Sequence, residues 1–559
     1  MHRYLTPTEV FGAVPQDDQS LEWLRDADQE VVLGQVAFWM SKFDHVGLNG
    51  WKEIERNWVS ESINEPFRSR LLELLQGDRV LVSPQSLLIV AKRALTAGHP
   101  SSLVDPRPLF MAAVSIQWGL GGRRDPNEDR ASRHVRLLVE VLRAQMFHRR
   151  PDWTTRIAQS EIRWREIPAL EGMNLPVAPA ESFERVTGVP LVDFQSIGFY
   201  LFAEATAHPG GTPTVATIAE VTHWDRDRLE RALALISAPI ADIAAAIRVE
   251  ESAGGENWTF DPLRRFPILR LDGDRILVLS PGLLMERTFG WLPYFDMTRP
   301  DNPTPATKVI AKQAEQPFQK VCEREVIETL RVNVAVGRRH GRFFDGAALR
   351  AAYPTGQIAD AAIAYRDEWL IFEVSSGQLK RETVVGGVAA LDADFERLVD
   401  EKVDQIDATI AHIRADPARL TGDTQRRRRF VPVLVIAEGM PLNPLTHITI
   451  ADRLTAAGRL RGADVEVLHI LEMEDLYVAE TIVESERLGL NEVLDLHRHA
   501  GLMRRVDLRA WWLMERRLRE LRPNRLNVRY DSAMDLITEN LGMDKEVVEA
   551  EGTASIHNG

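Results

Sequence analysis

The order of apolar and polar positions predicts a largely helical first half of the chain. Between residues 30 and 39, apolar side chains recur at spacings of three and four, which is typical of an amphipathic helix. Residues 194–205 and 225–247 are expected to form further helices. Two short apolar runs at 268–271 and 276–279 flank a turn-type cluster, and this pattern predicts a β-hairpin.

The pattern changes after a Pro-rich linker at residues 298–305. Helical and strand-like segments then alternate, and the apolar run at 431–437 has the length of a core strand. The fold class predicted is therefore α+β, with mostly helical N-terminal and middle domains before an α/β core. The expected units are a helical domain at 1–175, a helical domain at 181–300, the core at 306–480, a helical extension at 481–548 and a disordered polar tail at 549–559.

Composition narrows the class of protein. The chain has 559 residues, a net charge of −14 and 45% hydrophobic residues, as in an ordinary globular protein. The single cysteine, Cys322, excludes an internal disulfide and a Cys-rich zinc site, so we expect a reducing, cytoplasmic setting. Neither a signal peptide nor a run of roughly 20 apolar residues is evident, so no membrane is expected as a partner.

Several common catalytic motifs are missing from the sequence. It has no Gly-Lys dipeptide and hence no P-loop, no Gly-x-Ser-x-Gly elbow and no His-Glu-x-x-His pair. His497 and His499 would point in different directions on a helix, and we expect both at the surface. These absences direct attention to acidic residues.

Two carboxylates interrupt an apolar stretch at residues 358–376, which is expected to form two strands and a tight turn. Asp360 and Glu373 stand among Ala, Ile and Phe, where an unpaired carboxylate costs several kcal/mol. A shared divalent cation would remove both this cost and the mutual repulsion. The sequence therefore indicates a site for Mg²⁺ or Mn²⁺ held by Asp360 and Glu373.

Strand register provides a test of this hypothesis. A two-residue turn at Arg366 and Asp367 makes the numbers of facing residues sum to 733, which places Asp360 opposite Glu373. A four-residue turn would leave the two acids diagonal on one face. A three-residue turn would separate them onto opposite faces and exclude a shared ion.

Residues 306–475 resemble the PD-(D/E)xK nucleases, the restriction-endonuclease-like superfamily. Asp360 and Glu373 match the two strand acids of that family, and Glu323 on the expected helix 317–330 matches its helical Glu. The resemblance implies a metal-dependent phosphodiesterase with these residues in its active site.

The chain departs from the family at the lysine, because Ser375 stands in its place. Lys380, just beyond the strand, and Lys402, on the apolar stripe of the next helix, are the two candidate replacements. Migration of the lysine to the following helix occurs in the family, so the resemblance favours Lys402 as the catalytic lysine. It would orient or deprotonate the attacking water.

Structural interpretations of the same residues stay open. Asp360 and Glu373 could belong to a salt bridge with Arg381 or Lys402, and Lys402 could extend past the apolar stripe to water. Glu323 could be an ordinary surface residue on a charged helix.

Two basic features are candidates for nucleic-acid contacts. One is a set of arginines that could line a phosphate-binding groove: Arg426, Arg427, Arg428, Arg429, Arg338, Arg339 and Arg342. The other is a helix-turn-helix-like segment at 214–236, which would turn Arg226, Arg228 and Arg231 outward. Such segments are also found as ordinary arginine-rich loops and helical hairpins.

The sequence thus favours a cytoplasmic nuclease that hydrolyses DNA, with Asp360, Glu373, Lys402 and Glu323 as site residues. A role in bacterial antiviral defence or repair follows by analogy only. The alternative is a catalytically inactive nuclease-like module that binds nucleic acid or a protein. A protein partner or self-association remains open.

Overall fold

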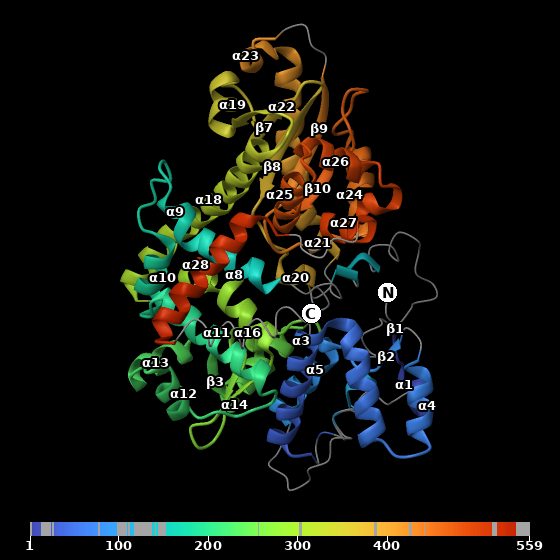
Figure 1. The fold of residues 1–559 in the computed structure, drawn as a ribbon, viewed down its shortest axis with the longest axis vertical. Helices are drawn as coiled ribbons and strands as arrows, with labels where there is room; N and C mark the ends of the chain where they lie inside the picture. The colour runs from blue at the N-terminus through green and yellow to red at the C-terminus, as the bar shows by residue number, and fades with distance from the viewer. Residues whose placement is uncertain are drawn as a thin grey trace.

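A computed structural model shows a predominantly helical molecule (Figure 1). It describes residues 3–12, 24, 27–76, 79–97, 109, 112–116, 137–139, 141–142, 152–254, 257–300, 304–384, 388–423, 428–440, 442–516 and 522–543. Arg426, Arg427 and the tail at 549–559 lie outside these residues. The structure is α+β, and its described part contains sheets of two, three and five strands.

The N-terminal part is a small helical layer with one short parallel strand pair. Its elements are β1 (Arg3–Tyr4), α1 (Pro7–Phe11), α3 (Gln29–Ser62), α4 (Phe67–Leu74), β2 (Arg79–Val80) and α5 (Pro84–Ala97). The amphipathic helix predicted at 30–39 is confirmed as part of α3, whose N-cap Asp28 accepts a hydrogen bond from Val31 N at 3.0 Å.

The middle part combines helices with a three-stranded sheet. Its elements are α8 (Trp153–Glu161), the π-helical turn η1 (Ile162–Glu166), α9 (Ile167–Ala169), α10 (Pro179–Thr187), α11 (Leu191–Ala207), α12 (Val215–Thr222), α13 (Arg226–Ala234), β3 (Ser237–Pro239), α14 (Ile240–Ser252), α15 (Asp261–Arg265), β4 (Ile268–Arg270), β5 (Ile276–Val278), α16 (Pro281–Phe289) and α17 (Leu292–Thr298). The β4–β5 hairpin confirms the pattern at 268–279. The single helix predicted at 225–247 is wrong, because β3 separates α13 from α14. Pro239 lacks an N–H and holds the preceding residue extended.

The C-terminal half begins with the long helix α18 and contains the five-stranded sheet. Its elements are α18 (Pro305–Val336), β6 (Arg342–Asp345), α19 (Gly346–Ala352), β7 (Ala361–Ala364), β8 (Glu368–Ser375), α20 (Arg381–Val384), α21 (Val388–Phe395), η2 (Glu396–Asp400), α22 (Glu401–Ala415), α23 (Ala418–Thr421), β9 (Arg429–Ile436), α24 (Pro444–Ala457), β10 (His469–Glu472), α25 (Met473–Glu486), α26 (Leu490–Arg498), η3 (Gly501–Arg505), α27 (Leu508–Arg516) and α28 (Asn524–Leu541). The predicted start of the first helix at Pro317 is wrong, because α18 begins at Pro305 after the N-cap Thr304 and continues through Pro317.

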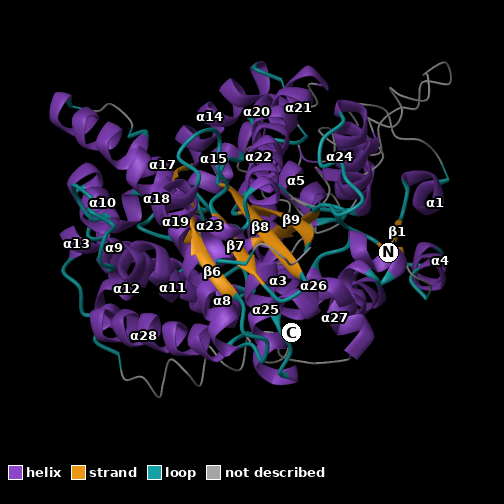
Figure 2. Cartoon of the chain, turned by 90° about the horizontal axis from the view of Figure 1, so that it is seen from above, coloured by secondary structure: helices purple, strands orange, loops and turns teal. Residues whose placement is uncertain are grey.

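The five strands lie in the order β10-β9-β8-β7-β6, with helices on both faces of the sheet (Figure 2). The pairs β6–β7 and β7–β8 are antiparallel, whereas β8, β9 and β10 are parallel. Side chains alternate along β8, so Leu370 and Phe372 share a core with α18 and α25, whereas Trp369 and Ile371 share a core with α22. Glu373 and Ser375 follow Trp369 and Ile371 onto the α22 face.

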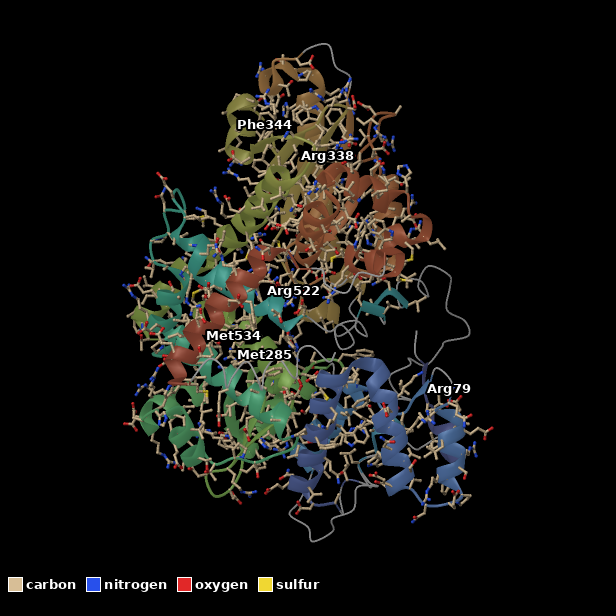
Figure 3. The ribbon with its side chains drawn as sticks, viewed as in Figure 1. Arg79, Met285, Arg338, Phe344, Arg522 and Met534 are labelled. Carbon is tan, nitrogen blue, oxygen red and sulfur yellow. The ribbon has the colours of Figure 1, made fainter. Side chains whose placement is uncertain are left out.

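The last helix, α28, leaves the core and returns to the middle part, where it packs on α8 and α11. Met534 of α28 and Met285 of α16 belong to one apolar core and lie close together (Figure 3). Trp224 Nε1 donates to the carbonyl of Asn540 at 2.9 Å, which fixes the end of α28 against the α12–α13 pair.

No individual helix in the described ranges is both long and apolar enough to cross a membrane. One pair, Pro179–Thr187 with Leu191–Ala207, meets the length and composition criteria together but is bent by 83°.

Candidate active site

The β7–β8 hairpin brings the two strand acids together. Tyr365 N donates to Glu368 O at 2.9 Å, and Ala361 pairs with Phe372, so the turn contains two residues and the facing numbers sum to 733. The predicted register is therefore confirmed. Asp360, directly before β7, faces Glu373 on β8.

Backbone hydrogen bonds fix both carboxyl groups in this arrangement. Val374 N donates to Asp360 Oδ2 at 2.9 Å, and Asp360 N donates to Glu373 Oε2 at 3.2 Å. Each acid thus receives an N–H from the strand that carries the other. The Glu373 side chain is only 1% exposed, so water contributes little to its solvation.

Lys402 reaches the same acids from the neighbouring helix α22. Its Nζ donates to Glu373 Oε1 at 2.8 Å, and its side chain remains 26% exposed. The expectation that Lys402 lies on the inner face of its helix agrees with this contact. Of the two structural alternatives, a simple extension into water is excluded, whereas an ion pair with Glu373 is observed.

The charges of these residues act strongly on one another. Burial, and next the charge of Asp360, raise the pKa of Glu373 to about 8, although Lys402 acts in the opposite direction. Burial also raises the pKa of Asp360. Burial disfavours the Lys402 ammonium, but the charges of Glu373, Asp360 and then Glu323 outweigh burial and raise its pKa. Without a metal, the acid cluster therefore holds protons more tightly than isolated carboxyl groups do, and Lys402 stays charged.

Glu323 approaches the pair from α18. Its side chain is partly buried, and burial followed by the charge of Asp360 raises its pKa. The charges of Lys402, Lys320 and Arg350 counteract that rise. The structure therefore brings Glu323 into the electrostatic neighbourhood of Asp360 and Lys402, from an element far from them in the sequence.

The pair Asp360 and Glu373 fits a hard divalent cation. In the described part of the chain, no cluster of three or more His, Cys, Asp or Glu side chains could hold a metal ion. A cation here would therefore rest on these two carboxylates and complete its coordination with water, which is common for Mg²⁺. It would offset the repulsion between the two ionised acids, as a retained proton does in its absence.

Ser375 and Lys380 occupy different environments. Ser375 lies on the same face of β8 as Glu373 and is 1% exposed. Lys380 is exposed on the loop between β8 and α20. Of the two candidate replacements, Lys402 contacts the acids.

Of the arginines predicted to contact nucleic acid, Arg428 and Arg429 lie at the other end of the strands. Arg429 pairs with Glu368, five residues along β8 from Glu373, which is about 17 Å. Arg429 also forms an ion pair with Glu466 at 3.0 Å. Arg428 lies over the ring of Trp369 at 5.5 Å. The structure does not bring these arginines to the acids.

Two further arginines of that set are exposed near the end of α18. Arg338 lies in the same part of the molecule as Phe344 of β6 (Figure 3). Arg339 forms an ion pair with Glu492 at 2.8 Å, and Arg342 donates to the carbonyl of Thr421 at 3.1 Å. They likewise lie away from Asp360.

The helix-turn-helix-like segment is a pair of helices, α12 and α13, as predicted. Arg228, however, does not project outward: it binds Asp193 at 2.6 Å and lies 4.0 Å from the ring of Trp224. Arg226 is exposed and pairs with Asp274 at 2.6 Å. Both arginines thus bind neighbouring acids of the middle part, and Arg228 helps to hold α13 on α11.

A cavity of about 1440 Å³ lies at the carboxyl ends of the parallel strands β8, β9 and β10. Its lining includes Gln319, one turn before Glu323 on α18, and Ser376, which follows β8. Glu323, Asp360, Glu373 and Lys402 themselves do not line this cavity.

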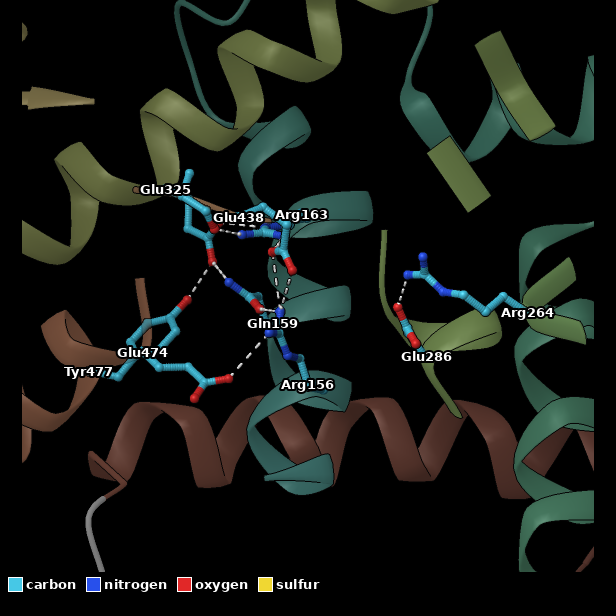
Figure 4. Close-up of polar contacts among 10 residues, drawn as sticks. Arg156, Gln159, Arg163, Arg264, Glu286, Glu325, Glu438, Glu474 and Tyr477 are labelled. Carbon is cyan, nitrogen blue, oxygen red and sulfur yellow. Dashed lines mark hydrogen bonds and ion pairs between the residues drawn. The ribbon is translucent and has the colours of Figure 1, made fainter. Parts of the chain in front are cut away.

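The arginines of the cavity are mostly neutralised by acids. Arg156 binds Glu438 at 3.0 Å, and Arg264 binds Glu286 (Figure 4). Arg287 binds the cavity's Asp296 at 2.5 Å. These cations are already engaged and carry little free charge toward a ligand.

A buried polar network outside the predicted site residues connects the helical middle part to the core. Arg163 on η1 binds Glu325 of α18 at 2.6 Å and Glu438 at 3.1 Å, and Gln159 and Tyr477 also bind Glu325 (Figure 4). Arg163 stands between the apolar Ile162 and Trp164, but its partners lie more than 160 residues away.

The prediction that His497 lies at the surface is wrong. His497 is buried beside Trp511, at a ring distance of 5.0 Å, because α27 covers this face of α26. His499 is exposed as expected.

Comparison with protein-family models, curated proteins and solved structures finds no match to this chain.

Proposed function

We propose that the chain hydrolyses phosphodiester bonds of nucleic acid, with DNA as the favoured substrate, by means of a divalent cation held by Asp360 and Glu373. One observation carries the proposal: two carboxyl groups and the Lys402 ammonium meet at one face of a sheet, with 2.8 Å between Lys402 Nζ and Glu373 Oε1. A structural ion pair needs one acid, whereas this cluster places a second acid, Asp360, against the first.

Each side chain has a distinct role in this proposal. When bound, the cation would polarise the scissile phosphate and acidify a water molecule. Lys402 stays an ammonium because its pKa is raised, so it donates a hydrogen bond to water or to a phosphate oxygen and cannot accept a proton. Glu323, whose pKa is also raised, is the carboxylate that accepts the proton of the attacking water.

The test is cleavage of labelled single-stranded DNA, duplex DNA and RNA by the full chain with Mg²⁺, Mn²⁺ or EDTA. Asp360→Asn, Glu373→Gln and Lys402→Met are each expected to lower the rate by about 10²-fold or more. Asp367→Asn is the matched control, because this exposed acid lies in the turn of the same hairpin. Equal metal-dependent rates in all five proteins would refute the proposed site.

A catalytically inactive, nucleic-acid- or protein-binding module is the second candidate. The buried Ser375 favours it, since serine cannot provide the positive charge that the family's lysine contributes at that position. Binding of nucleic acid by wild-type protein without cleavage under any metal condition would select this candidate.

A further inference from the structure

Two cations near the acid cluster form no ion pair with its acids. Lys320 lies three residues before Glu323 on α18, and Arg350 lies on α19; both side chains are exposed. Neither forms an ion pair within the ranges that the structure describes. Their charges act on the site, since both favour the ionised form of Glu323, and Arg350 also favours that of Asp360.

The position of Arg350 follows from strand register. Asp345 pairs with Ala361 across β6 and β7, so Gly346, the first residue of α19, faces Asp360. Arg350 follows one helical turn later, and this turn brings its side chain back over Gly346. Arg350 is therefore held directly beside the backbone of Asp360.

The glycine at 346 leaves space for the guanidinium. A Cβ placed there would lie 3.2 Å from Arg350 Nη1, 3.3 Å from Nη2 and 3.2 Å from the carbonyl oxygen of Asp360. Contacts this close require a neighbour to move, and of these three atoms only the guanidinium nitrogens belong to a flexible side chain. Gly346 thus permits the close approach of Arg350 to the site.

Other cations around this site are already paired. Lys402 binds Glu373, Arg331 binds Asp345 at 2.6 Å, and Arg324 binds Glu328 at 2.7 Å. The cavity arginines described above are neutralised in the same way. Arg350 and Lys320 thus remain as two cations near the acids for which the described ranges show no ion pair.

The acids and the two cations together determine which anionic group can bind here. A group of acids repels a phosphodiester unless cations offset the repulsion where the backbone passes. A guanidinium presents two parallel N–H donors that match two phosphate oxygens, and a lysine ammonium binds phosphate as a point charge.

We propose that Arg350 and Lys320 bind backbone phosphates of a nucleic acid whose scissile bond lies at the Asp360–Glu373 pair. The inference rests on the proposed function, because it assigns the contacts that would hold the substrate at that site. It replaces the arginines around Arg429, which lie at the opposite end of β8, as the phosphate contacts of the site itself.

The experiment measures the binding of fluorescein-labelled duplex and single-stranded DNA by anisotropy in EDTA, over a range of salt concentrations. Arg350→Gln and Lys320→Gln are each expected to weaken binding severalfold for all sequences. Each is also expected to reduce the slope of log affinity against log salt by about 0.9 for duplex DNA and about 0.7 for single strands. Arg338→Gln and Arg366→Gln remove exposed arginines elsewhere and should leave affinity and slope unchanged.

Two further variants separate loss of a contact from loss of the fold. Arg350→Lys retains the charge and should preserve the salt slope while losing part of the affinity. Gly346→Ala changes no charge but displaces the guanidinium, so weaker binding is expected with an unchanged circular dichroism spectrum. Wild-type affinity and slope in both Arg350→Gln and Lys320→Gln would overturn the proposal, as would failure of the wild type to bind either DNA.

The DNA-binding result can be separated from DNA cleavage. Asp360→Asn removes a negative charge and should bind DNA at least as tightly as wild type while losing cleavage. If Asp360→Asn instead cleaves at the wild-type rate, the proposed function fails even where the Arg350 and Lys320 result holds.

Discussion

Replacing Glu373 by glutamine should remove a pH dependence of stability that originates in the buried acid pair. The folded chain without metal holds the Glu373 proton up to a pKa of about 8, against an ordinary value of 4.5 in the unfolded chain. The folded state therefore binds more protons than the unfolded state between these values. The stability contributed by this group is fully present below pH 4.5 and is lost as the pH rises to about 8.

The magnitude follows from the same two values. At about 1.4 kcal/mol per pKa unit, the difference corresponds to at most about 5 kcal/mol of unfolding free energy. Glutamine has the same shape but no proton to lose. We therefore expect Glu373→Gln to become more stable relative to wild type by several kcal/mol between pH 5 and pH 9.

The assay is urea denaturation followed by tryptophan fluorescence in EDTA at pH 5, 6, 7, 8 and 9. Glu55 and Asp475 also have pKa values raised to about 8, chiefly by burial, but they titrate equally in both proteins and cancel in the difference. Saturating Mn²⁺ should restore wild-type stability at pH 8, by about 2.7 kcal/mol at one hundred times the dissociation constant, and should do less for Glu373→Gln. Parallel wild-type and variant curves across this range would falsify the reasoning.

Three other substitutions test buried charges elsewhere in the chain. Arg163→Met leaves the buried Glu325 without its arginine partner, so it should cost about 3–5 kcal/mol of unfolding free energy. The control Arg339→Met removes one partner of an exposed ion pair and should cost less than about 1 kcal/mol, and similar costs for the two variants would contradict the assigned burial. Lys92→Met likewise removes one partner of a buried ion pair and should cost about 3–5 kcal/mol by urea denaturation, and a loss below about 1 would argue against that pair. Burial lowers the pKa of His469 to about 3, so the wild type should lose stability as the pH falls from 6.5 toward 3. Thermal denaturation should show a smaller loss for His469→Gln, and identical pH profiles of the two proteins would count against a buried neutral imidazole.

The parts of the site that sequence could predict are those set by local geometry. The hairpin register depends only on the turn length and on strand alternation, so the facing of Asp360 and Glu373 follows from residues within one short segment. The helical periodicity around Lys402 is equally local. These features need no knowledge of distant elements.

The parts that could not be predicted depend on contacts between segments far apart in the chain. Glu323 and Glu325 are two residues apart on α18, yet Glu325 is the buried one, because Arg163 and Tyr477 bind it. The apolar spacing of α18 puts Glu325 on the buried face, but the partners that bind it there are far away in the sequence. Arg350 was not a candidate for the same reason: its role comes from the β6–β7 pairing and from the missing side chain at Gly346.

The path of α28 has a consequence for how the chain folds during its synthesis. Arg529 of α28 binds Glu166, and Asn540 binds Asp193 and Ser196, so residues near the end complete a layer made more than 300 residues earlier. The helices α8 and α11 gain this neighbour only after more than 300 further residues have been translated. The middle part, although translated before the sheet, is therefore expected to reach its final packing after the sheet, and a nascent chain should expose that apolar surface to chaperones until α28 has been made.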